Sequence, residues 1–495
     1  MIIAHDLGTS GNKATLVDDA GTLKQAVTVS YGADWGTDGK AEQNPQDWWD
    51  AVCEATRTLL EKSGVAGTDV DVVSFSGQMM GVVPLDADGN VVRPSIIWAD
   101  TRSQAQCDRL LAQVSMEDAY RITGHRLNAT YSLSKLMWLR DEEPDNFARM
   151  TDFVLAKDYV AYRLTGVRAT DPSDASSTNA YDQSSGTWSE PLIDAAGLDL
   201  ALFPRIVPST EVIGTVTAEA ARATGLASGT KVVMGGGDGP MAALGAGITS
   251  AESGAYCYLG SSSWVSVASD APLVDPQMRS MTFNHVIPGR FVPTATMQAG
   301  GASLSWAVDA LSDRDTRQWD ELLAAAADVE AAMNGMFFLP HLIGERSPYW
   351  NPRARGVFAG LHLDHGKAHL MRAVLEGVVF NLYTGLRAFT ENGQEVTHID
   401  AIGGAASSDL MLRLMADVWG VPVAARDIVE EANAIGAAVV AGVGAGIFDS
   451  FETATRLSHR GADHEPDAAR HEAYREPYAR FLDAYRHIEP WFDTV

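Results

Sequence analysis

One pattern occurs twice in this chain, near the N-terminus and again in its second half: an apolar strand, a glycine turn with small hydroxyl residues, and a second β-rich segment. In the first copy Ile2 to Leu7 leads into Gly8-Thr9-Ser10-Gly11, and in the second Ala255 to Leu259 leads into Gly260-Ser261-Ser262-Ser263. Glycine allows the backbone to approach a phosphate closely, and the N–H groups of the turn then point at its oxygens. Two such hairpins facing each other would clamp one triphosphate, although two ordinary hairpins with glycine turns fit the same pattern.

The chain has 495 residues, too many for one hydrophobic core, because single cores stop growing near roughly 250 residues. Hydrophobic residues make up 46% of the sequence and charged residues 20%, which is typical of a globular protein with a sizeable interior. We therefore predict two domains, residues 1–248 and 249–495, each with one of the two hairpins. Strand-like and helix-like segments alternate along both, so the predicted class is α/β. Residues 47–62 have helical spacing, with Trp48, Val52, Ala55 and Leu59 on one apolar stripe.

Charge and cysteine content limit which binding partners and which cellular compartment are expected for this protein. Lys and Arg total 37 against 64 for Asp and Glu, a formal net charge of -27, so nucleic acid and membrane surfaces are not expected as partners. The three cysteines lie far apart, and no basic n-region precedes the first strand. The longest apolar stretch, residues 434–448, is too short to cross a bilayer and is predicted to be a tightly packed helix. A cytoplasmic protein is expected, and a homodimer is left open.

A candidate catalytic carboxylate follows a short apolar run in the first half. Val232-Val233-Met234 is followed by three glycines, Asp238 and Gly239. A hydroxyl group is a poor nucleophile at neutral pH, and a carboxylate within hydrogen-bond reach can accept its proton as it attacks phosphorus. The glycines would let both substrates approach Asp238 with little steric obstruction. A turn with a solvated aspartate is the alternative interpretation.

Motifs along the whole chain resemble those of the FGGY family of carbohydrate kinases, most of all its xylulokinase branch. The resemblance rests on the order of the set and not on any single motif. The matching segments are Asp6 to Lys13, Ala41 to Pro45, Gly77 to Gly81, Trp98 to Arg102, Lys135 to Trp138, Ala156 to Tyr159, Asp171 to Ala175, Gly237-Asp238, Gly356 to Leu361 with His369 to Glu376, and Gly403 to Ala405. The resemblance implies two actin-like, ribonuclease-H-like domains with a cleft between them, and ATP-dependent phosphorylation of a small sugar.

The resemblance also implies roles for individual residues. Asp238 would be the general base, and Asp6 with Asp238 would hold Mg²⁺, which prefers one or two carboxylates together with phosphate oxygens. The ATP phosphates would be bound by Gly8, Thr9, Ser10 and Lys13 from one side and by Gly260, Ser261 and Ser262 from the other. Gly403, Gly404 and Ala405 would lie flat against the adenosine, although a helix-opening loop fits those three equally well.

The expected sugar site departs from the xylulokinase pattern at two positions. Its residues would be Gln78, Met79, Met80, Trp98, Asp100, Arg102 and Gly239. Met80 replaces an expected histidine and Gly239 an expected asparagine, so the pocket loses two hydrogen-bonding groups and with them some discrimination between hydroxyls. D-xylulose is therefore the leading substrate, and another ketose, a polyol or a sugar acid such as gluconate is the alternative. Trp98 would equally suit a core, because it follows Ile96 and Ile97.

Two other classes of protein fit parts of the sequence. An actin-like ATPase that binds a protein partner would use the same two-domain clamp. It would not need the turn near Gln78 or a base such as Asp238. A regulatory sugar-binding protein without turnover would not need intact Asp6, Asp238 and Gly260 loops.

Overall fold

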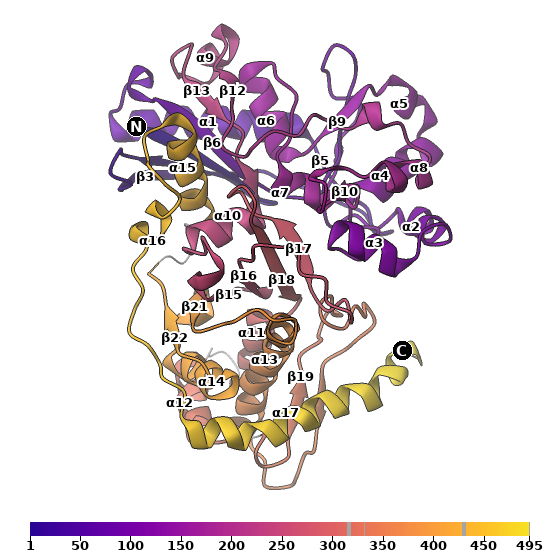
Figure 1. Cartoon of the computed structure of the whole chain (residues 1–495). Helices are drawn as coiled ribbons and strands as arrows, with labels where there is room; N and C mark the ends of the chain where they lie inside the picture. The colour runs from indigo at the N-terminus through magenta and orange to yellow at the C-terminus, as the bar shows by residue number, and fades with distance from the viewer. Residues whose placement is uncertain (314–317, 331, 428–431, 495) are drawn as a thin grey trace.

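The computed structural model describes residues 1–313, 318–330, 332–427 and 432–494. Two lobes, each built around a mixed β-sheet, lie one above the other in Figure 1, with the N-terminus in the upper lobe and α17 (Ala468–Ile488) crossing the lower one. The α/β class predicted from the sequence is confirmed. In the described part of the chain, no helix combines the length and the apolar character needed to cross a membrane.

The sheet of the first lobe is built around the predicted N-terminal hairpin. Strand β1 (Ile2–Leu7) pairs antiparallel with β2 (Gly11–Val17) and parallel with β6 (Val72–Gly77). The strand order is β12-β13-β6-β1-β2-β3, and β14 also pairs with β6. The remaining strands are β3 (Leu23–Ser30), β12 (Val212–Thr215), β13 (Lys231–Val233) and β14 (Gly236–Gly237), with β3 and β12 at the two edges.

The sheet of the second lobe repeats this arrangement. Strand β15 (Ala255–Leu259) pairs antiparallel with β16 (Ser263–Val267) and parallel with β21 (Ile399–Ile402), as β1 does with β2 and β6. The strand order is β17-β18-β16-β15-β21-β22, which adds β17 (Met281–Asn284), β18 (Phe291–Met297) and β22 (Val423–Ala425). The repeated sequence pattern is thus a repeated hairpin at the centre of two related sheets.

Helix α1 (Pro45–Ser63) covers one face of the first sheet. Asn44 caps it, because its side-chain oxygen accepts a hydrogen bond from the Gln46 N–H at 3.1 Å. The apolar stripe of α1 that the sequence predicted shares a core with Ile3 and Leu7 of β1. Helices α6 (Ala156–Thr165) and α9 (Ala218–Thr224) pack in the same layer.

Helix α10 (Asp238–Gly245) lies between the two sheets (Figure 1). Its Met241 and Leu244 pack with the first sheet, whereas Ala242, Ala243 and Ala246 pack with Tyr256 and Ile402 of the second. Helix α15 (Ala432–Ala445), predicted as residues 434–448, also packs on the first sheet although it comes from the second half of the chain. The domain boundary between residues 248 and 249 stays a prediction. Helix α15 belongs to the second predicted domain by sequence but packs on the sheet of the first.

Short elements extend the first lobe, and several of them share a separate core that includes Leu133, Phe153 and Leu192. They are β4 (Asp34–Trp35), β5 (Ala41–Gln43), β7 (Val83–Leu85), β8 (Ser95–Ile96), β9 (Asp152–Val154), β10 (Tyr181–Asp182), β11 (Thr187–Trp188), α2 (Gln104–Leu111), α3 (Met116–Thr123), α4 (Ser132–Glu142), α5 (Pro144–Arg149), α7 (Pro172–Ala175) and α8 (Glu190–Ala195). The second lobe adds α11 (Gly301–Leu311), α12 (Trp319–Ala327), α13 (Lys367–Thr390), α14 (Asp409–Trp419), α16 (Thr453–Leu457), β19 (Phe337–Leu339) and β20 (Val357–Ala359).

Candidate active site

Strand register brings Asp6 and Asp238 to the same edge of the first sheet. Asp6 on β1 is opposite Ser76 on β6, and Ser76 is opposite Gly236 on β14. Neighbouring strands lie about 4.8 Å apart, and Asp238 follows two residues after Gly236. Ile2 and Ala4 of β1 pack with α15, so alternation puts Asp6 on that same face, where α10 begins. The two aspartates that the sequence singled out are therefore close neighbours.

The environment of Asp238 suits a proton acceptor. Burial first, and then the negative charge of Asp6, raise the pKa of Asp238 to about 7. The Gly239 N–H donates to Asp238 Oδ1 at 2.8 Å, and this hydrogen bond lowers the pKa of Asp238. A base is most effective when its pKa lies near the working pH, so this carboxyl group can take a proton near neutrality and release it again. Burial and the charge of Asp238 also raise the pKa of Tyr256 on the second sheet. Asp238 is therefore close to both sheets and lies between the lobes.

Asp6 is held by groups from two distant parts of the chain. Burial raises its pKa, whereas a hydrogen bond from Asn433 and the charge of Lys13 lower it. Lys13 lies opposite Asp6 across the β1–β2 hairpin, and the Asn433 side-chain N–H donates to Asp6 Oδ1 at 3.2 Å. Asn433 was missed from the sequence, where it is one polar residue in an Ala- and Gly-rich helix.

The donor set at this edge fits Mg²⁺. Carboxylate oxygens are the protein ligands that this hard cation prefers, and two of them leave its other positions to phosphate oxygens and water. Among the described residues there is no group of three or more His, Cys, Asp or Glu side chains that could hold a metal by themselves. Asp6 and Asp238 would therefore hold the ion together with the nucleotide.

The turn of the first hairpin is fixed through its carbonyl groups. Tyr31 donates its hydroxyl to the Gly8 carbonyl at 2.7 Å and its N–H to the Ser10 carbonyl at 3.1 Å. Gln43 donates its side-chain N–H to the Thr9 carbonyl at 2.7 Å. Since neighbouring groups occupy these oxygens, the turn is rigid while Ser10 is exposed. A phosphate would meet N–H and hydroxyl donors here.

The turn of the second hairpin is held in the same manner. The first N–H groups of α11, from Gly301 and Ala302, donate to the carbonyls of Gly260 at 2.7 Å and Ser261 at 3.0 Å. Ser261 and Ser262 are exposed. Gly403 lies directly beside Leu259 with a φ of 95°, and a Cβ there would be 2.9 Å from the Leu259 backbone. The structure thus brings the Gly260 turn and the loop of Gly403, Gly404 and Ala405 together at one edge of the second sheet.

The predicted sugar turn, Gly77 to Gly81, packs against the predicted catalytic loop, Gly235 to Gly239. The Gln78 side-chain N–H donates to Gln43 Oε1 at 2.7 Å, and the Gln78 Oε1 is buried with no hydrogen-bond partner among the described residues. A Cβ on Gly237 would lie 2.6 Å from the Met79 side chain, and one on Gly239 would lie 3.9 Å from it. Met80 has a φ of 66°, in the left-handed region that non-glycine residues rarely adopt.

The wall around this turn is largely apolar. Met79 and Met80 form a cluster with Tyr131, Met281, Phe283 and the partly buried Trp350. The buried Lys135, which lies in a matching segment but was given no role from the sequence, donates to the carbonyl of Met80 at 2.9 Å and to that of Ile97 at 2.8 Å. Burial lowers the pKa of Lys135 to about 7. Lys135 thus fixes the backbone of the sugar turn through buried hydrogen bonds.

The structure separates Trp98 from Asp100 and Arg102. Trp98 is 37% exposed and donates its ring N–H to Thr9 Oγ1 at 2.9 Å, so it lies beside the first phosphate turn and not in the core. Asp100 is 1% exposed, and its oxygens accept from the Ala41 N–H and from Arg102. Arg102 also pairs with Glu42 at 2.5 Å. Direct sugar contacts by Asp100 and Arg102 stay a prediction.

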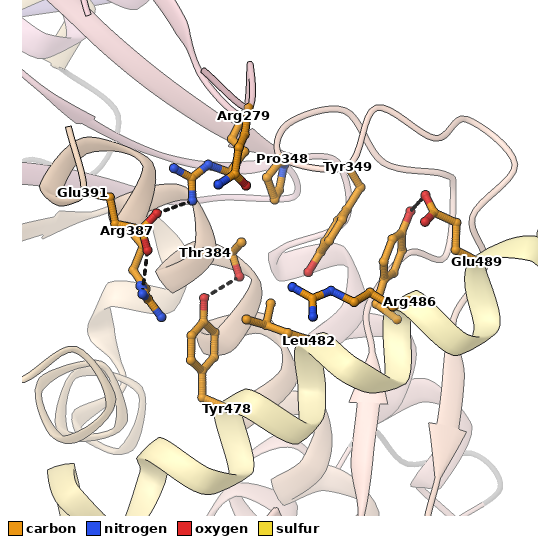
Figure 2. A pocket seen from close by; sticks show the side chains of 12 residues that line it. Arg279, Pro348, Tyr349, Thr384, Arg387, Glu391, Tyr478, Leu482, Arg486 and Glu489 are labelled. Carbon is orange, nitrogen blue, oxygen red and sulfur yellow. Dashed lines mark hydrogen bonds and ion pairs between the residues drawn. The ribbon is translucent and has the colours of Figure 1, made fainter. Parts of the chain in front are cut away.

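A pocket of about 450 Å³ lies elsewhere, between α17, α13 and residues 348–349 (Figure 2). Glu391 in this pocket pairs with Arg279 at 2.6 Å and with Arg387 at 2.5 Å. Tyr478 hydrogen bonds to Thr384 at 3.0 Å. None of the site residues predicted from the sequence lines this pocket.

Two family models match the chain over most of its length. Residues 1–245 match the N-terminal domain and residues 255–445 the C-terminal domain of the FGGY family of carbohydrate kinases. The xylulose kinase of Bacillus subtilis (strain 168) is 32% identical over 489 residues, which cover 99% of this chain and 97% of that protein.

Solved structures agree over the whole chain. The ligand-bound xylulose kinase from Lactobacillus acidophilus has a TM-score of 0.94 and 26% identity, covering 100% of this chain and 99% of that one. The gluconate kinase from the same organism has a TM-score of 0.93 and 26% identity over 98% of each chain. The likeness therefore spans both lobes.

Proposed function

The chain belongs to the FGGY family of carbohydrate kinases and is a sugar kinase, and we propose that Asp238 is the base that accepts the proton of the sugar hydroxyl as that oxygen attacks the terminal phosphorus of ATP. The bond between this phosphorus and the bridging oxygen of ADP breaks as the new one forms. ADP and a sugar phosphate leave, and Asp238 returns the proton to solvent.

One observation carries this proposal: Asp238 lies between the lobes with a pKa raised to about 7, beside the second carboxylate, Asp6. Mg²⁺ bound by these carboxylates would neutralise charge on the phosphates. The turns at Gly8 to Ser10 and Gly260 to Ser262 would supply N–H and hydroxyl donors from either lobe, and the Gly403 loop would lie against the adenosine. Sugar kinases of this family use ATP, so the nucleotide follows from the family.

D-xylulose is the first candidate acceptor. Proteins named xylulose kinase are similar to this chain over nearly its full length in sequence and in structure. The apolar wall formed by Met79 and Met80, with no side-chain donor at Gly239, leaves few groups to select among sugar hydroxyls. We therefore expect a broad preference among small ketoses and polyols.

A sugar acid is the second candidate, and two arginines favour it. Arg346 reaches Met281 Sδ at 4.0 Å, and Arg126 lies 5.4 Å from the Trp350 ring centre, so both flank the wall of the sugar turn. Among the described residues, neither belongs to an ion pair. An arginine without a carboxylate partner suits an anionic ligand, and a gluconate kinase shares this fold.

The test of the base is the variant D238N. We expect kcat to fall by roughly 10²- to 10⁴-fold, the usual contribution of a general base, while the dissociation constant for ATP measured without Mg²⁺ stays within two- to threefold. The exposed Asp88 supplies the control, because D88N removes a carboxylate that has no part in the proposed site and should leave both values unchanged. Turnover near that of the unaltered enzyme would remove Asp238 from this role.

The test of the acceptor is a coupled assay of ATP consumption with pentuloses, hexuloses, polyols and sugar acids. D-xylulose with the largest kcat/KM supports the first candidate, and gluconate the second. Phosphate release at the same rate without any carbohydrate would instead favour the partner-binding ATPase considered from the sequence.

A further inference from the structure

A short segment beneath the site carries serines that contact three separate parts of the molecule. Helix α7 (Pro172–Ala175) continues into a single helical turn, Ser176–Thr178, and Ser173, Ser176 and Ser177 are 0% exposed. Each serine accepts a hydrogen bond from a backbone N–H on a different element. The donors are Gly237 to Ser173 at 2.9 Å, Asn284 to Ser176 at 3.0 Å and Met80 to Ser177 at 3.2 Å.

The direction of each hydroxyl is fixed. Ser173 donates its own proton to Asp171 Oδ2 at 2.6 Å. Ser176 donates to the Ser173 carbonyl and Ser177 to the Asp174 carbonyl, both at 2.7 Å. Since each proton points inward along the segment, a lone pair of each oxygen points outward to the remote N–H.

The segment is anchored by a buried charged cluster. Asp171 pairs with Lys157 at 3.0 Å and accepts from the Ser209 hydroxyl at 2.7 Å. Lys157 also pairs with Asp158 at 2.5 Å and Asp174 at 3.0 Å, and all these charged side chains are fully buried. Breaking a buried pair of this kind is costly, so the anchor resists displacement. A Cβ on Gly77, at the start of the sugar turn, would lie 2.8 Å from Lys157 Cβ, so the anchor also packs directly against that turn.

The three donors lie at the working parts of the site. Gly237 directly precedes Asp238, Met80 is in the sugar turn, and Asn284 ends β17 of the second lobe. We propose that Ser173, Ser176 and Ser177 form a positioning hub that holds the catalytic loop, the end of β17 and the sugar turn in one fixed relation, about which the rest of the second lobe can move. This inference rests on the role proposed for Asp238 and adds three positioning residues to it.

The hub predicts a different kinetic defect for each serine. Without Ser173 the N–H of Gly237 loses its acceptor and Asp238 shifts, and a displacement of about 1 Å can cost roughly 10²-fold in rate. Without Ser177 the strained Met80 backbone loses its restraint, so sugar binding weakens. Without Ser176 the first lobe loses a bond to the second, so each substrate has less influence on binding of the other.

The experiment compares S173A, S176A and S177A with T178V. Thr178 is also 0% exposed, but in the described part of the chain its hydroxyl bonds to the Ala175 carbonyl and the Ala180 N–H and to no remote element, so T178V controls for loss of a buried hydroxyl. We expect S173A to lower kcat by about 10- to 100-fold with KM values nearly unchanged. We expect S177A to raise the sugar KM by about tenfold, and S176A to reduce the effect of sugar on the KM for ATP. T178V should keep all kinetic constants within two- to threefold.

Thermal midpoints separate positioning from stability. The four variants should lower the midpoint to a similar extent, because each loses one buried hydroxyl. If their kinetic constants are also alike, or if S173A keeps its kcat, the serines only stabilise the fold and the hub is wrong. If S173A does not fold, the variants S173T and S173C replace it. S173T keeps the hydroxyl and S173C keeps only a weak acceptor, so equal kcat values for these two variants would also reject the hub. D238N tests the base separately, so normal turnover in D238N rejects the base whatever the serines do.

Discussion

At the scale of single residues, burial sets the charge of His285 and hydrogen bonds set which ring nitrogen carries its proton. His285 is buried between β17 and α10, where the Ile287 N–H donates to its Nδ1 at 3.2 Å and its Nε2 contacts the Ile248 carbonyl at 2.8 Å. Nδ1 is therefore the acceptor and Nε2 carries the proton. Protonation of Nδ1 would remove the first bond. Burial lowers the pKa of His285 to about 4, although the Ile248 contact acts in the opposite direction.

This histidine predicts a loss of stability in acid. The pKa of His285 in the unfolded chain is the ordinary 6.5, so between pH 6.5 and about 4 the unfolded state binds more protons than the folded state. The contribution of His285 to the free energy of unfolding is fully present above pH 6.5. It falls by up to about 3 kcal/mol as pH decreases, because a shift of one pKa unit corresponds to ~1.4 kcal/mol. Thermal midpoints of H285Q, measured from pH 7.5 to 4.5, should depend less on pH than those of the unaltered protein.

The exposed His459 is the control for that measurement. H459Q should keep the pH dependence of the unaltered protein, because the His459 side chain is 86% exposed. An equal slope in H285Q and H459Q would show that protonation of His285 does not limit stability.

At the scale of elements, the crossing of α10 and α15 joins the two halves of the chain. A Cβ on Gly436 of α15 would lie 2.2 Å from the Met241 carbonyl, and one on Gly245 of α10 would lie 1.8 Å from the Ala432 carbonyl. The helices thus approach so closely that only glycine fits at these two points. The same approach brings Asn433 to Asp6, so this crossing supports both the core and the candidate site.

A methyl group at the crossing should therefore be destabilising. We expect G436A to cost about 1–3 kcal/mol, the usual cost of overpacking, and to lower the thermal midpoint by several degrees in differential scanning calorimetry. G32A is the matched variant, because a Cβ on Gly32 has no atom within 4 Å. G32A should change the midpoint little, and equal midpoints for the two variants would contradict the close crossing.

At the scale of the whole molecule, the proposed site uses both lobes. Asp6, Asp238 and the sugar turn belong to the first, whereas the Gly260 turn and the Gly403 loop belong to the second. Phosphoryl transfer must exclude water, because water would otherwise take the phosphoryl group in place of the sugar. Two lobes joined through α10 can meet this need by closing on their substrates.

Closure predicts a smaller radius of gyration with both substrates bound. Small-angle X-ray scattering with sugar and a nonhydrolysable ATP analogue should show compaction relative to the free protein, and each ligand alone should have a smaller effect. An unchanged radius with both ligands at saturation would argue that the lobes do not move.

The sequence by itself determined the class of fold, the two central hairpins, the helices at residues 47–62 and 434–448 and the family, because these depend on local patterns: alternation in strands, spacing in helices and glycine turns. It also singled out Asp6 and Asp238. Only the tertiary structure decided which residues surround them. Asn433 meets Asp6 across 427 positions of sequence, and Ser173 meets Gly237 across 64. Asp100 was predicted to contact the sugar, which stays a prediction, and the structure adds that its carboxylate accepts hydrogen bonds from the Ala41 N–H and Arg102. Such contacts depend on strand register and on the path of the chain between elements, which no local pattern records.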